Sequence, residues 1–348
     1  MGLILLVDMD YFFAACEESR HPELKSKPLV VGTAPVESKE HGVVQTCNYI
    51  AREFGIRSAI SVANALKLNP NLVYVHSDES FYEQMSIKVM SIVRSYGLRM
   101  EALSIDEVAI EYNGDDYESA MELAKSIKER INGELKLPCT IGISTSKVYA
   151  KMVCDANKPD RIGMVKKDEL LQFMHEKDVG TILGVGPKTR QRLEQIGVKT
   201  IYDLSRVDAT TLLEMFGKFG GELRLIALGE DTSGVLDESE AISIGRERTI
   251  GDTSDISTIG KAIMELTDET FVELKKKNLR FGAVGAKVRY QDFSVRTRIK
   301  KLSKPSDSKE LAYNTCMSLI ESMLSGRKVR KVGIRLAGLE HSKGQKRL

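Results

Sequence analysis

The sequence lacks long hydrophobic runs and paired cysteines, and each absence excludes a class of protein. No apolar run approaches the ~20 residues that span a bilayer, and the chain opens directly on a predicted strand. We therefore expect a protein that is neither secreted nor embedded in a membrane. The five cysteines are scattered and form no CxxC pair, which argues against a disulfide framework or a zinc site and favours the reducing cytoplasm.

The net charge of +2 conceals two parts of opposite sign. From residue 244 to the end, 23 Lys and Arg stand against 12 Asp and Glu, a net charge of +11, whereas residues 1–243 carry 28 against 37, a net charge of −9. The basic part indicates an anionic partner, and nucleic acid is the leading candidate. At 348 residues the chain is long enough for two to four domains.

Acidic residues interrupt two segments that otherwise have the pattern of buried strands. Residues 103–110 are mostly apolar but contain Asp106 and Glu107 side by side, and the opening strand leads into Asp8. Charged side chains seldom lie in such places unless they are paired or bound to a cation. Because Mg²⁺ takes oxygen ligands and is often shared with substrate phosphates, we expect two adjacent strands that hold Mg²⁺ between them. The alternative is an edge strand with solvated acids.

Strand periodicity leaves two questions open at this site. Asp106 and Glu107 should point to opposite faces of a regular strand, so both reach one site only if the strand ends or bulges there. Asp8 and Asp10 share a parity, so the pattern does not say which of the two binds the metal.

Hydrophobic periodicity predicts alternating strands and helices before residue 160. The expected strands are residues 2–9, 28–32, 103–110 and 139–144. A helix is expected to start near residue 11, and further helices are residues 44–55, 81–96, 117–133 and 147–157. This order predicts an α+β sandwich with helices on one face, in which residues 19–78 form an insertion. Tyr49 and Arg52 share a helix face, and taken alone they are interpreted as a packed tyrosine and a solvated arginine.

Residues 179–197 have a different pattern, in which a Gly184-x-Gly186 turn leads into a helix that starts at Pro187 and ends before Gly197. The pattern predicts a helix-hairpin-helix, whose glycines let backbone N–H groups and a helix N-terminus approach a DNA phosphate. The alternative is an ordinary αα-hairpin with a glycine turn.

A polar, acidic linker is expected at residues 233–243, before a basic domain. In that domain, basic and apolar residues alternate along a hairpin and along the last strand, so we expect one sheet face under helices and the other lined with cations. The cations assigned to the open face are Lys287, Arg289, Arg296, Arg298, Lys300, Lys331 and Arg335. Such a face predicts binding of a phosphate backbone without base readout.

Five motifs, in order, make the chain resemble the Y-family DNA polymerases, in the archaeal-type DinB or DNA polymerase IV branch. They are Asp8-Met9-Asp10-Tyr11-Phe12-Phe13-Ala14, Asn48-Tyr49-x-Ala51-Arg52, Ser104-Ile105-Asp106-Glu107, Gly142-Ile143-Ser144 with Lys147-x-x-Ala150-Lys151, and Lys158-Pro159. Any one of these motifs is weak evidence, but five in sequence over nearly the whole chain are strong.

The resemblance implies a multidomain α+β fold. Residues 1–18 and 79–167 would form a ferredoxin-like palm, residues 19–78 small fingers, and residues 168–232 a helical thumb that carries the helix-hairpin-helix. Residues 244–348 would form the little finger, an α+β domain with a four-stranded sheet and two helices. This division agrees with the one drawn from periodicity and charge.

The resemblance also implies roles for individual residues. Asp8, Asp106 and Glu107 would bind two Mg²⁺ ions with the backbone carbonyl of Met9, and Asp10 would be structural. Residues at the incoming nucleotide would be Tyr11, Phe12, Phe13, Thr46, Tyr49, Arg52 and Lys158, with Phe13 as the steric gate against a ribose 2′-hydroxyl. Residues at the DNA, besides the cations of the open sheet face, would be Lys147, Lys151, Gly184, Gly186, Lys188, Arg190, Arg246 and Arg248.

We therefore expect a template-directed DNA polymerase of the low-fidelity translesion type, which adds dNTPs to a primer 3′-hydroxyl by two-metal-ion nucleotidyl transfer. Primer–template DNA and dNTP are the expected partners, and a monomer is expected. No stretch is left over for a proofreading exonuclease. The family often ends in a hydrophobic-aromatic peptide that docks on a sliding clamp, and residues 344–348 lack one, so either the chain is truncated or clamp binding would need another contact.

Two rival functions remain at the level of sequence. A nucleotide cyclase could also use carboxylates on adjacent strands, but it needs neither a helix-hairpin-helix nor a basic sheet. A non-catalytic DNA-binding protein could carry a degenerate palm, but the intact Asp8, Asp106 and Glu107 argue against that.

Overall fold

The computed structural model describes residues 2–33, 42–236, 243–324 and 326–341. The chain divides into two compact units between residues 238 and 239, and each unit is described by itself. Residues 237–242 of the predicted linker and residues 344–348, for which we expect no clamp-binding peptide, lie outside the described residues. Over the part of the chain described, no helix is both long and apolar enough to cross a membrane.

The central strand of the first unit places the acidic segments side by side. A five-stranded sheet has the order β5-β6-β1-β7-β8. Its strands are β1 (Leu3–Asp8), β5 (Met100–Ala102), β6 (Glu107–Tyr112), β7 (Thr140–Ser144) and β8 (Ile162–Met164). β1 is antiparallel to both neighbours, and Asp8 lies opposite Glu107 of β6 and Thr140 of β7. The adjacent acidic strands predicted from the sequence are therefore confirmed.

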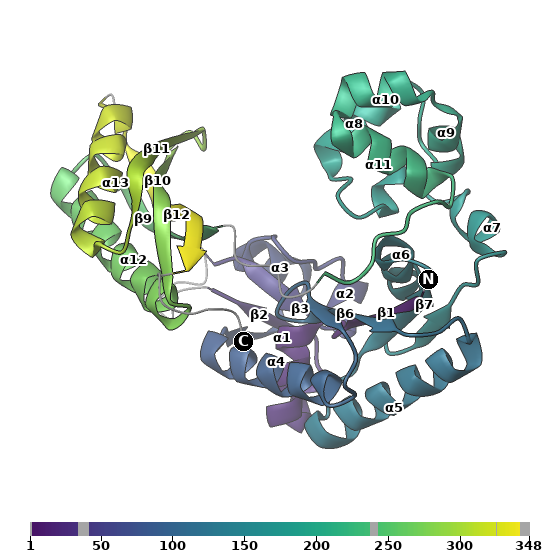
Figure 1. Cartoon of the computed structure of the whole chain (residues 1–348). Helices are drawn as coiled ribbons and strands as arrows, with labels where there is room; N and C mark the ends of the chain where they lie inside the picture. Colours follow the sequence, from purple (N-terminus) through teal and green to yellow (C-terminus); the bar gives the residue numbers. More distant parts are fainter. Residues whose placement is uncertain (1, 34–41, 237–242, 325, 342–348) are drawn as a thin grey trace. The chain divides into compact units, whose positions relative to one another are not determined.

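Helices cover both faces of this sheet, not one (Figure 1). They are α1 (Phe12–Arg20), α4 (Glu79–Arg94), α5 (Tyr117–Leu135) and α6 (Lys147–Asn157). Leu5 and Val7 of β1 share a core with α1, α4 and α5. Ile4 and Leu6 share a separate, smaller core with α6. The prediction of helices on one face is wrong because β1 is apolar on both of its faces, and each face needs a cover.

The insertion after α1 forms a small sheet with two helices. Its elements are η1 (Pro22–Leu24), β2 (Leu29–Gly32), β3 (Val44–Cys47), α2 (Tyr49–Glu53), α3 (Val62–Leu68) and β4 (Val73–His76), with the strands in the order β3-β2-β4. Residues 44–47, predicted as part of a helix, are strand β3. Val44 and Thr46 are β-branched and pair with β2. Asn48 then starts α2, because its Oδ1 accepts a hydrogen bond from the Ala51 N–H at 3.0 Å.

α5 also differs from its predicted end at Gly133. The helix continues through this glycine to Leu135, which packs against the core. Lys136, in the left-handed conformation with φ 58°, ends the helix, and its N–H donates to the Asn132 carbonyl. Packing of the last turn therefore outweighs the weak helix propensity of glycine.

A helical region follows the sheet. Its elements are α7 (Leu170–Met174), η3 (Val179–Thr181), α8 (Pro187–Glu194), α9 (Ile201–Arg206), α10 (Ala209–Phe216) and α11 (Lys218–Ala227). As predicted, α8 starts at Pro187, and Gly197 (φ 81°) lies in the left-handed turn after it. The next segment, residues 228–236, forms no helix or strand, but Val235 is buried against Ile4 and Leu6.

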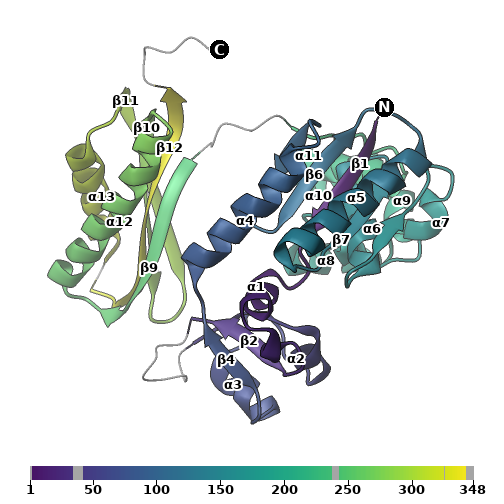
Figure 2. The ribbon, with the colours of Figure 1, turned by 90° about the horizontal axis from the view of Figure 1, so that it is seen from below.

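The second unit has a four-stranded antiparallel sheet with two helices on one face (Figure 2), as predicted. Its elements are β9 (Ser243–Thr253), α12 (Ile256–Lys276), β10 (Leu279–Tyr290), β11 (Val295–Ser306), α13 (Lys309–Leu324) and β12 (Val329–His341). The strand order is β11-β10-β12-β9, so β11 and β9 are the edge strands. The core lies between α12, α13 and the inner face of the sheet.

Candidate active site

Two carboxylates from different strands meet at one ammonium group. Asp8 at the end of β1 and Glu107 at the start of β6 are direct partners in the sheet. Lys151 of α6 forms ion pairs with both, and its Nζ lies 2.9 Å from Asp8 Oδ2. The Nζ of Lys158 lies 2.5 Å from the same Asp8 oxygen. The sheet register and the packing of α6 therefore build an acidic cluster that already attracts positive charge.

The main chain of Asp106 lies next to this cluster because the predicted strand 103–110 is broken, while its carboxylate accepts a hydrogen bond from the Ser104 hydroxyl at 2.6 Å. β5 ends at Ala102, and the N–H groups of Leu103 and Ser104 both donate to the Glu107 carbonyl, at 2.9 and 3.3 Å, which makes a tight bend. Asp106 lies in this bend, and its own carbonyl accepts a hydrogen bond from the Met9 N–H at 3.0 Å. The strand rule that separates adjacent side chains therefore does not apply to Asp106.

Asp10 is held by structural contacts, which separates it from Asp8. Its carboxylate accepts hydrogen bonds from the Thr140 hydroxyl at 2.6 Å and from the Asp160 N–H at 3.0 Å. Its backbone is left-handed, with φ 55°, and its N–H donates to Asp8 Oδ1 at 2.9 Å. Burial raises the pKa of Asp10, and the two hydrogen bonds oppose that rise only in part. The expected structural role of Asp10 agrees with these contacts.

The charges of the cluster depend on one another. Burial raises the pKa of Asp8, but the ammonium groups of Lys151 and Lys158 outweigh burial, and the pKa is lowered. Burial raises the pKa of Glu107, and Lys151 offsets only part of that rise. Burial lowers the pKa of each lysine, but the neighbouring carboxylates, Asp8 foremost, together outweigh burial, and both pKa values are raised. Asp8 and both lysines are therefore charged at neutral pH.

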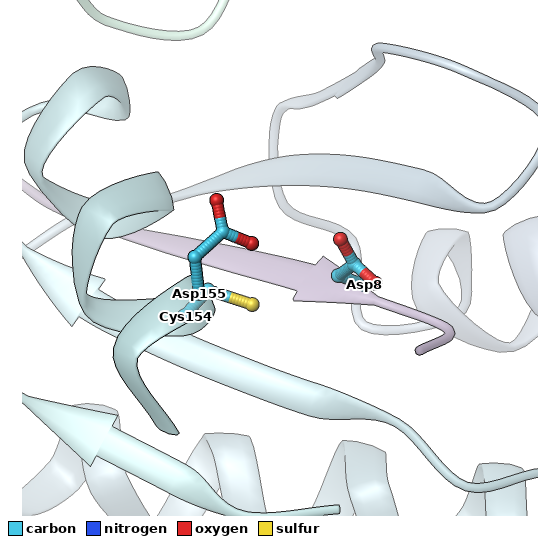
Figure 3. A group of neighbouring side chains, drawn as sticks. All are labelled: Asp8, Cys154 and Asp155. Carbon is cyan, nitrogen blue, oxygen red and sulfur yellow. The ribbon is translucent and has the colours of Figure 1, made fainter. Parts of the chain in front are cut away.

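Asp155 is a further carboxylate at the site, which the sequence pattern did not reveal. Figure 3 shows Asp8 at the end of β1 and Asp155 with Cys154 on α6, and one ligand atom of each lies within 4.8 Å of the others. The Cys154 thiol donates to the Thr140 carbonyl and is a soft donor, so it is unsuited to Mg²⁺. The missed signal was spacing, because Asp155 lies four residues after Lys151 on one helix face.

The donor set fits a hard divalent cation. The carboxylates of Asp8, Asp106 and Glu107 and the carbonyl of Met9 offer only oxygen, which Mg²⁺ prefers. In the ion pairs of the cluster, the carboxylates of Asp8, Glu107 and Asp155 stand against the two ammonium groups of Lys151 and Lys158. The remaining negative charge favours a bound cation.

The residues predicted to grip a triphosphate lie at two places. Tyr49 and Arg52 share a face of α2, as predicted, and the Arg52 Cζ lies 4.5 Å from the centroid of the Tyr49 ring. The Tyr49 ring also meets the Tyr11 ring edge-on, with 5.5 Å between centroids. Lys158, by contrast, lies in the acidic cluster against Asp8.

The aromatic residues after Asp10 have different surroundings. Phe12 is 1% exposed and belongs to the core, so only its main chain is left for a nucleotide contact. Phe13 is half-buried, and its ring stacks on Tyr82 with 4.5 Å between centroids and 14° between planes. Thr46 accepts a hydrogen bond from the Ala14 N–H at 3.2 Å, which supports the start of α1.

Two lysines predicted to touch DNA are occupied within the protein. The Nζ of Lys147 donates to Glu101 at 2.6 Å, and both side chains are largely buried. Lys151 lies in the acidic cluster. DNA contacts were predicted for these two residues, and in the structure both ammonium groups form ion pairs with carboxylates of the protein. The reason is that α6 faces the sheet with its lysines, which a helix pattern alone does not reveal.

The helix-hairpin-helix turn adjoins the acidic cluster. Residues 180–186 line a cavity of about 470 Å³ together with Lys151 and Asp155. Gly184 has φ 93°, a conformation that strongly favours glycine, and Gly186 precedes α8. Lys188 is exposed. Arg190 is exposed but forms ion pairs with Asp178 and Glu194.

The open face of the second sheet carries several of the predicted cations. Lys287, Arg289, Lys331 and Arg335 share this face, since Arg289 pairs with Lys331 and Lys287 pairs with Gly333. Residues of the face line a hollow of about 730 Å³. Glu247 contacts Lys287 at 2.6 Å and Lys331 at 3.7 Å, and four cations against this acid leave a positive surface.

Along the edge strand β11, the basic residues point to the opposite face of the sheet from the predicted one. Arg298 pairs with buried Ala286, and its guanidinium donates to Ser322 of α13, so it faces the helices. Arg296 and Lys300 have the same parity, and their partners Val288 and Val284 are fully buried. Thr297 and Ile299 lie on the open face instead.

The other edge strand, β9, carries Arg246 and Arg248, which were predicted to contact DNA without a predicted sheet face. Arg246 pairs with buried Ile334 and contacts Glu273 of α12 at 2.8 Å. Arg248 forms ion pairs with Glu265 and Glu269 of the same helix. Both arginines therefore face the helices. Edge strands lie beside the charged residues at the rim of the helices. The alternation of polar and apolar residues along an edge strand therefore does not indicate which of its faces the helices cover.

Comparisons with known proteins agree with the site. Residues 7–155 match the impB/mucB/samB family, and residues 241–348 match the impB/mucB/samB family C-terminal domain. The chain is 36% identical to DNA polymerase IV 1 of Methanosarcina mazei, over 99% of this chain and 98% of the relative. It is 35% identical to DNA polymerase IV of Methanoculleus marisnigri, over 97% and 94%.

Solved structures of Y-family polymerases have the same fold. The "Y-family DNA polymerase chimera Dbh-Dpo4(243-245)-Dbh" matches with a TM-score of 0.90 at 28% identity, over 98% of this chain and all of that one. The "Insertion ternary complex of Dbh DNA polymerase" matches with a TM-score of 0.71 at 27% identity, with the same coverage. These matches leave no support for the cyclase or the non-catalytic alternative. The chain belongs to the impB/mucB/samB family and is a Y-family, DNA polymerase IV-like translesion DNA polymerase.

Proposed function

We propose that the chain extends a DNA primer by two-metal-ion nucleotidyl transfer, with Asp8, Asp106 and Glu107 as metal ligands and help from the Met9 carbonyl. The observation that carries the proposal is the meeting of Asp8 and Glu107 around one ammonium group at the ends of paired strands. Two bound Mg²⁺ ions would lower the pKa of the attacking hydroxyl and neutralise the leaving pyrophosphate.

The residues around the cluster would position the substrates. Tyr49 and Arg52 would bind the triphosphate of a dNTP, since a guanidinium can bind two phosphate oxygens at once. Lys158 would share its charge between Asp8 and the triphosphate. Phe13, fixed against Tyr82, would occupy the space that a ribose 2′-hydroxyl needs.

Primer–template DNA would bind to two surfaces. The Dbh DNA polymerase, which has the same fold, forms an insertion ternary complex and a post-insertion binary complex. In this chain, the cations of the open sheet face and the glycine turn before α8 would contact the phosphate backbone. Contacts with backbone alone impose no base sequence, as a polymerase requires.

The domain names of the family would apply as follows. Residues 1–18 and 79–167 would be the palm and residues 19–78 the fingers, although the boundary at 18 falls inside α1. Residues 168–232 would be the thumb, and residues 244–348 the little finger. The core confined to residues 244–336 supports the little finger, whereas one core joins Leu29 of the fingers to the palm and another joins Tyr149 of the palm to the thumb.

The Asp106→Asn variant tests the metal site. It keeps the size of the side chain and removes its charge, so Mg²⁺-dependent primer extension should fall by at least about a hundredfold. DNA affinity, measured by fluorescence anisotropy with a labelled primer–template, should change by less than about twofold, because the carboxylate is not a phosphate ligand. Asp115→Asn, in an exposed loop, is the matched control and should retain activity. Full activity in Asp106→Asn would refute the assignment.

A further inference from the structure

Lys151 forms ion pairs with three carboxylates, of which two are proposed metal ligands and the third lies on its own helix. Its Nζ lies 2.9 Å from Asp8 Oδ2 and 3.1 Å from Asp155 Oδ1, and it forms an ion pair with Glu107. Its side chain is 16% exposed, so the ammonium group is held inside the cluster. Asp8 and Glu107 are proposed metal ligands. Asp155 lies one helical turn after Lys151, and its side chain is 46% exposed.

An ammonium group and a metal ion cannot use the same carboxylate oxygens freely. Lysine has three donors and no acceptor, so it cannot coordinate a cation. The Lys151 ammonium lies between Asp8 and Glu107, where a bound cation needs oxygen ligands. The ion pair with Asp155 joins residues four apart on α6 and does not depend on the other two contacts.

We propose that Lys151 is the counter-ion of the Asp8–Glu107 pair before metal binding, and that Asp155 retains its ammonium group when a divalent cation takes the pair. Lys151 is thus a positioning residue that keeps two repelling carboxylates together. It also sets the metal affinity, because its release from the pair is part of the binding equilibrium. This inference rests on the metal site of the proposed function.

Substitution of Lys151 and substitution of Asp155 should have opposite effects on metal affinity. Removing the ammonium group removes a competitor for Asp8 and Glu107, so metal should bind more tightly. Removing the charge of Asp155 removes the alternative partner, so Lys151 should stay on the catalytic pair and metal should bind more weakly. Loss of the Asp155 charge would also weaken binding if Asp155 were a direct metal ligand, and the double variant separates these cases.

The experiment measures Mn²⁺ binding to the full chain without DNA or nucleotide, by the electron paramagnetic resonance signal of free Mn²⁺, with Mg²⁺ as competitor. We expect Lys151→Gln to bind about tenfold more tightly and Asp155→Asn about tenfold more weakly. Lys151→Arg keeps the charge and should stay within about threefold of the unmodified chain. Lys125→Gln, on α5 across the sheet, is the matched control and should change affinity by less than about twofold.

The double variant decides between the two roles of Asp155. If Asp155 acts through Lys151, Asp155→Asn should change affinity by less than about twofold in the Lys151→Gln background. A tenfold loss that persists there would make Asp155 a direct ligand and overturn the proposal. Unchanged or weaker binding in Lys151→Gln, with a thermal unfolding midpoint that shows a folded protein, would also overturn it.

Failure of the metal site itself would look different. Glu107→Gln should weaken Mn²⁺ binding if the proposed function is right. Unchanged affinity in that variant would remove the metal site and this inference together. A loss in Glu107→Gln with no gain in Lys151→Gln would overturn only the role of Lys151.

Discussion

At the scale of single residues, the surroundings of Phe13 explain how an aromatic ring could select a sugar. The ring stacks on Tyr82, and the Tyr82 hydroxyl donates to Glu17 at 2.7 Å. Arg20 holds both oxygens of the same buried carboxylate, at 2.7 and 2.9 Å. Phe13 therefore rests on a tyrosine that is itself fixed, so the ring cannot easily move aside for a larger nucleotide.

Phe13→Ala should admit ribonucleotides. The ring that would clash with a 2′-hydroxyl is lost, and a clash of about 1–3 kcal/mol corresponds to roughly 5- to 150-fold in discrimination. The measurement is the ratio of kcat/KM for dNTP to that for NTP in single-nucleotide incorporation. Phe13→Tyr keeps the ring and should retain selectivity. An unchanged ratio in Phe13→Ala would remove the gate role from this residue.

At the scale of elements, α6 owes its position to a close approach to β7. A Cβ atom added to Gly142 would lie 2.1 Å from the Ala150 carbonyl oxygen and 2.4 Å from the Cys154 nitrogen, both in the backbone of α6. Only a glycine permits this contact. Since α6 carries Lys151 and Asp155, the same contact also positions these two side chains in the acidic cluster.

Gly142→Ala should therefore lower both stability and activity. The helix must shift to admit the methyl group, which should cost about 1–3 kcal/mol in the free energy of unfolding by urea. Primer extension should fall in the fraction that stays folded. Gly133→Ala, inside α5 with open space around it, is the matched control and should stabilise by about 0.5–1 kcal/mol. Equal stability of the two variants would contradict the close-packing argument.

The sheet face to which each arginine points gives a second test at this scale. Arg335 lies on the open face of the second sheet, opposite Gly285, whereas Arg298 faces the helices and contacts Ser322. Arg335→Ala should weaken DNA binding and lower the slope of log affinity against log salt by about 0.9 if one phosphate contact is lost. Arg298→Ala should leave the slope unchanged. A lower slope in Arg298→Ala together with an unchanged slope in Arg335→Ala would assign Arg298, not Arg335, to the DNA-binding surface.

At the scale of the whole molecule, charge and core divide the chain at the same place. Residues 244–348 carry a net charge of +11, and they contain a complete core of their own. The first unit, with a net charge of −9 in residues 1–243, holds the acidic cluster. An acidic catalytic unit needs a separate basic unit to hold DNA, because like charges repel.

Deletion of residues 244–348 should weaken DNA binding and flatten its dependence on salt. The remaining unit keeps its own cores and should stay folded, which circular dichroism can check. Affinity for a primer–template, measured at several salt concentrations, should show a smaller slope because fewer counterions are released. An unaltered slope would refute the basic-face argument.

The sequence alone determined the elements that depend on local pattern. Buried strands that carry acids, the glycine turn before Pro187, and the order of five motifs were sufficient for the two adjacent acidic strands, the start of α8 at Pro187 and the family. These features follow from the chemistry of residues close together in the chain. A strand pattern also gave the correct parity along β10 and β12, because both are central strands with one face packed on helices.

Only the tertiary structure decided which side chains that are distant in the sequence contact one another. Lys151 and Lys147 have the composition of a DNA-binding surface, but the packing of α6 turns them toward Asp8 and Glu101. Asp106 lies in a bend, not a strand, before β6, and its carbonyl accepts a hydrogen bond from the Met9 N–H. The basic residues of the edge strand β11 lie on the opposite face from the predicted one, and those of β9 also face the helices, since at the rim of a sheet both sides carry charge and polarity no longer marks the core.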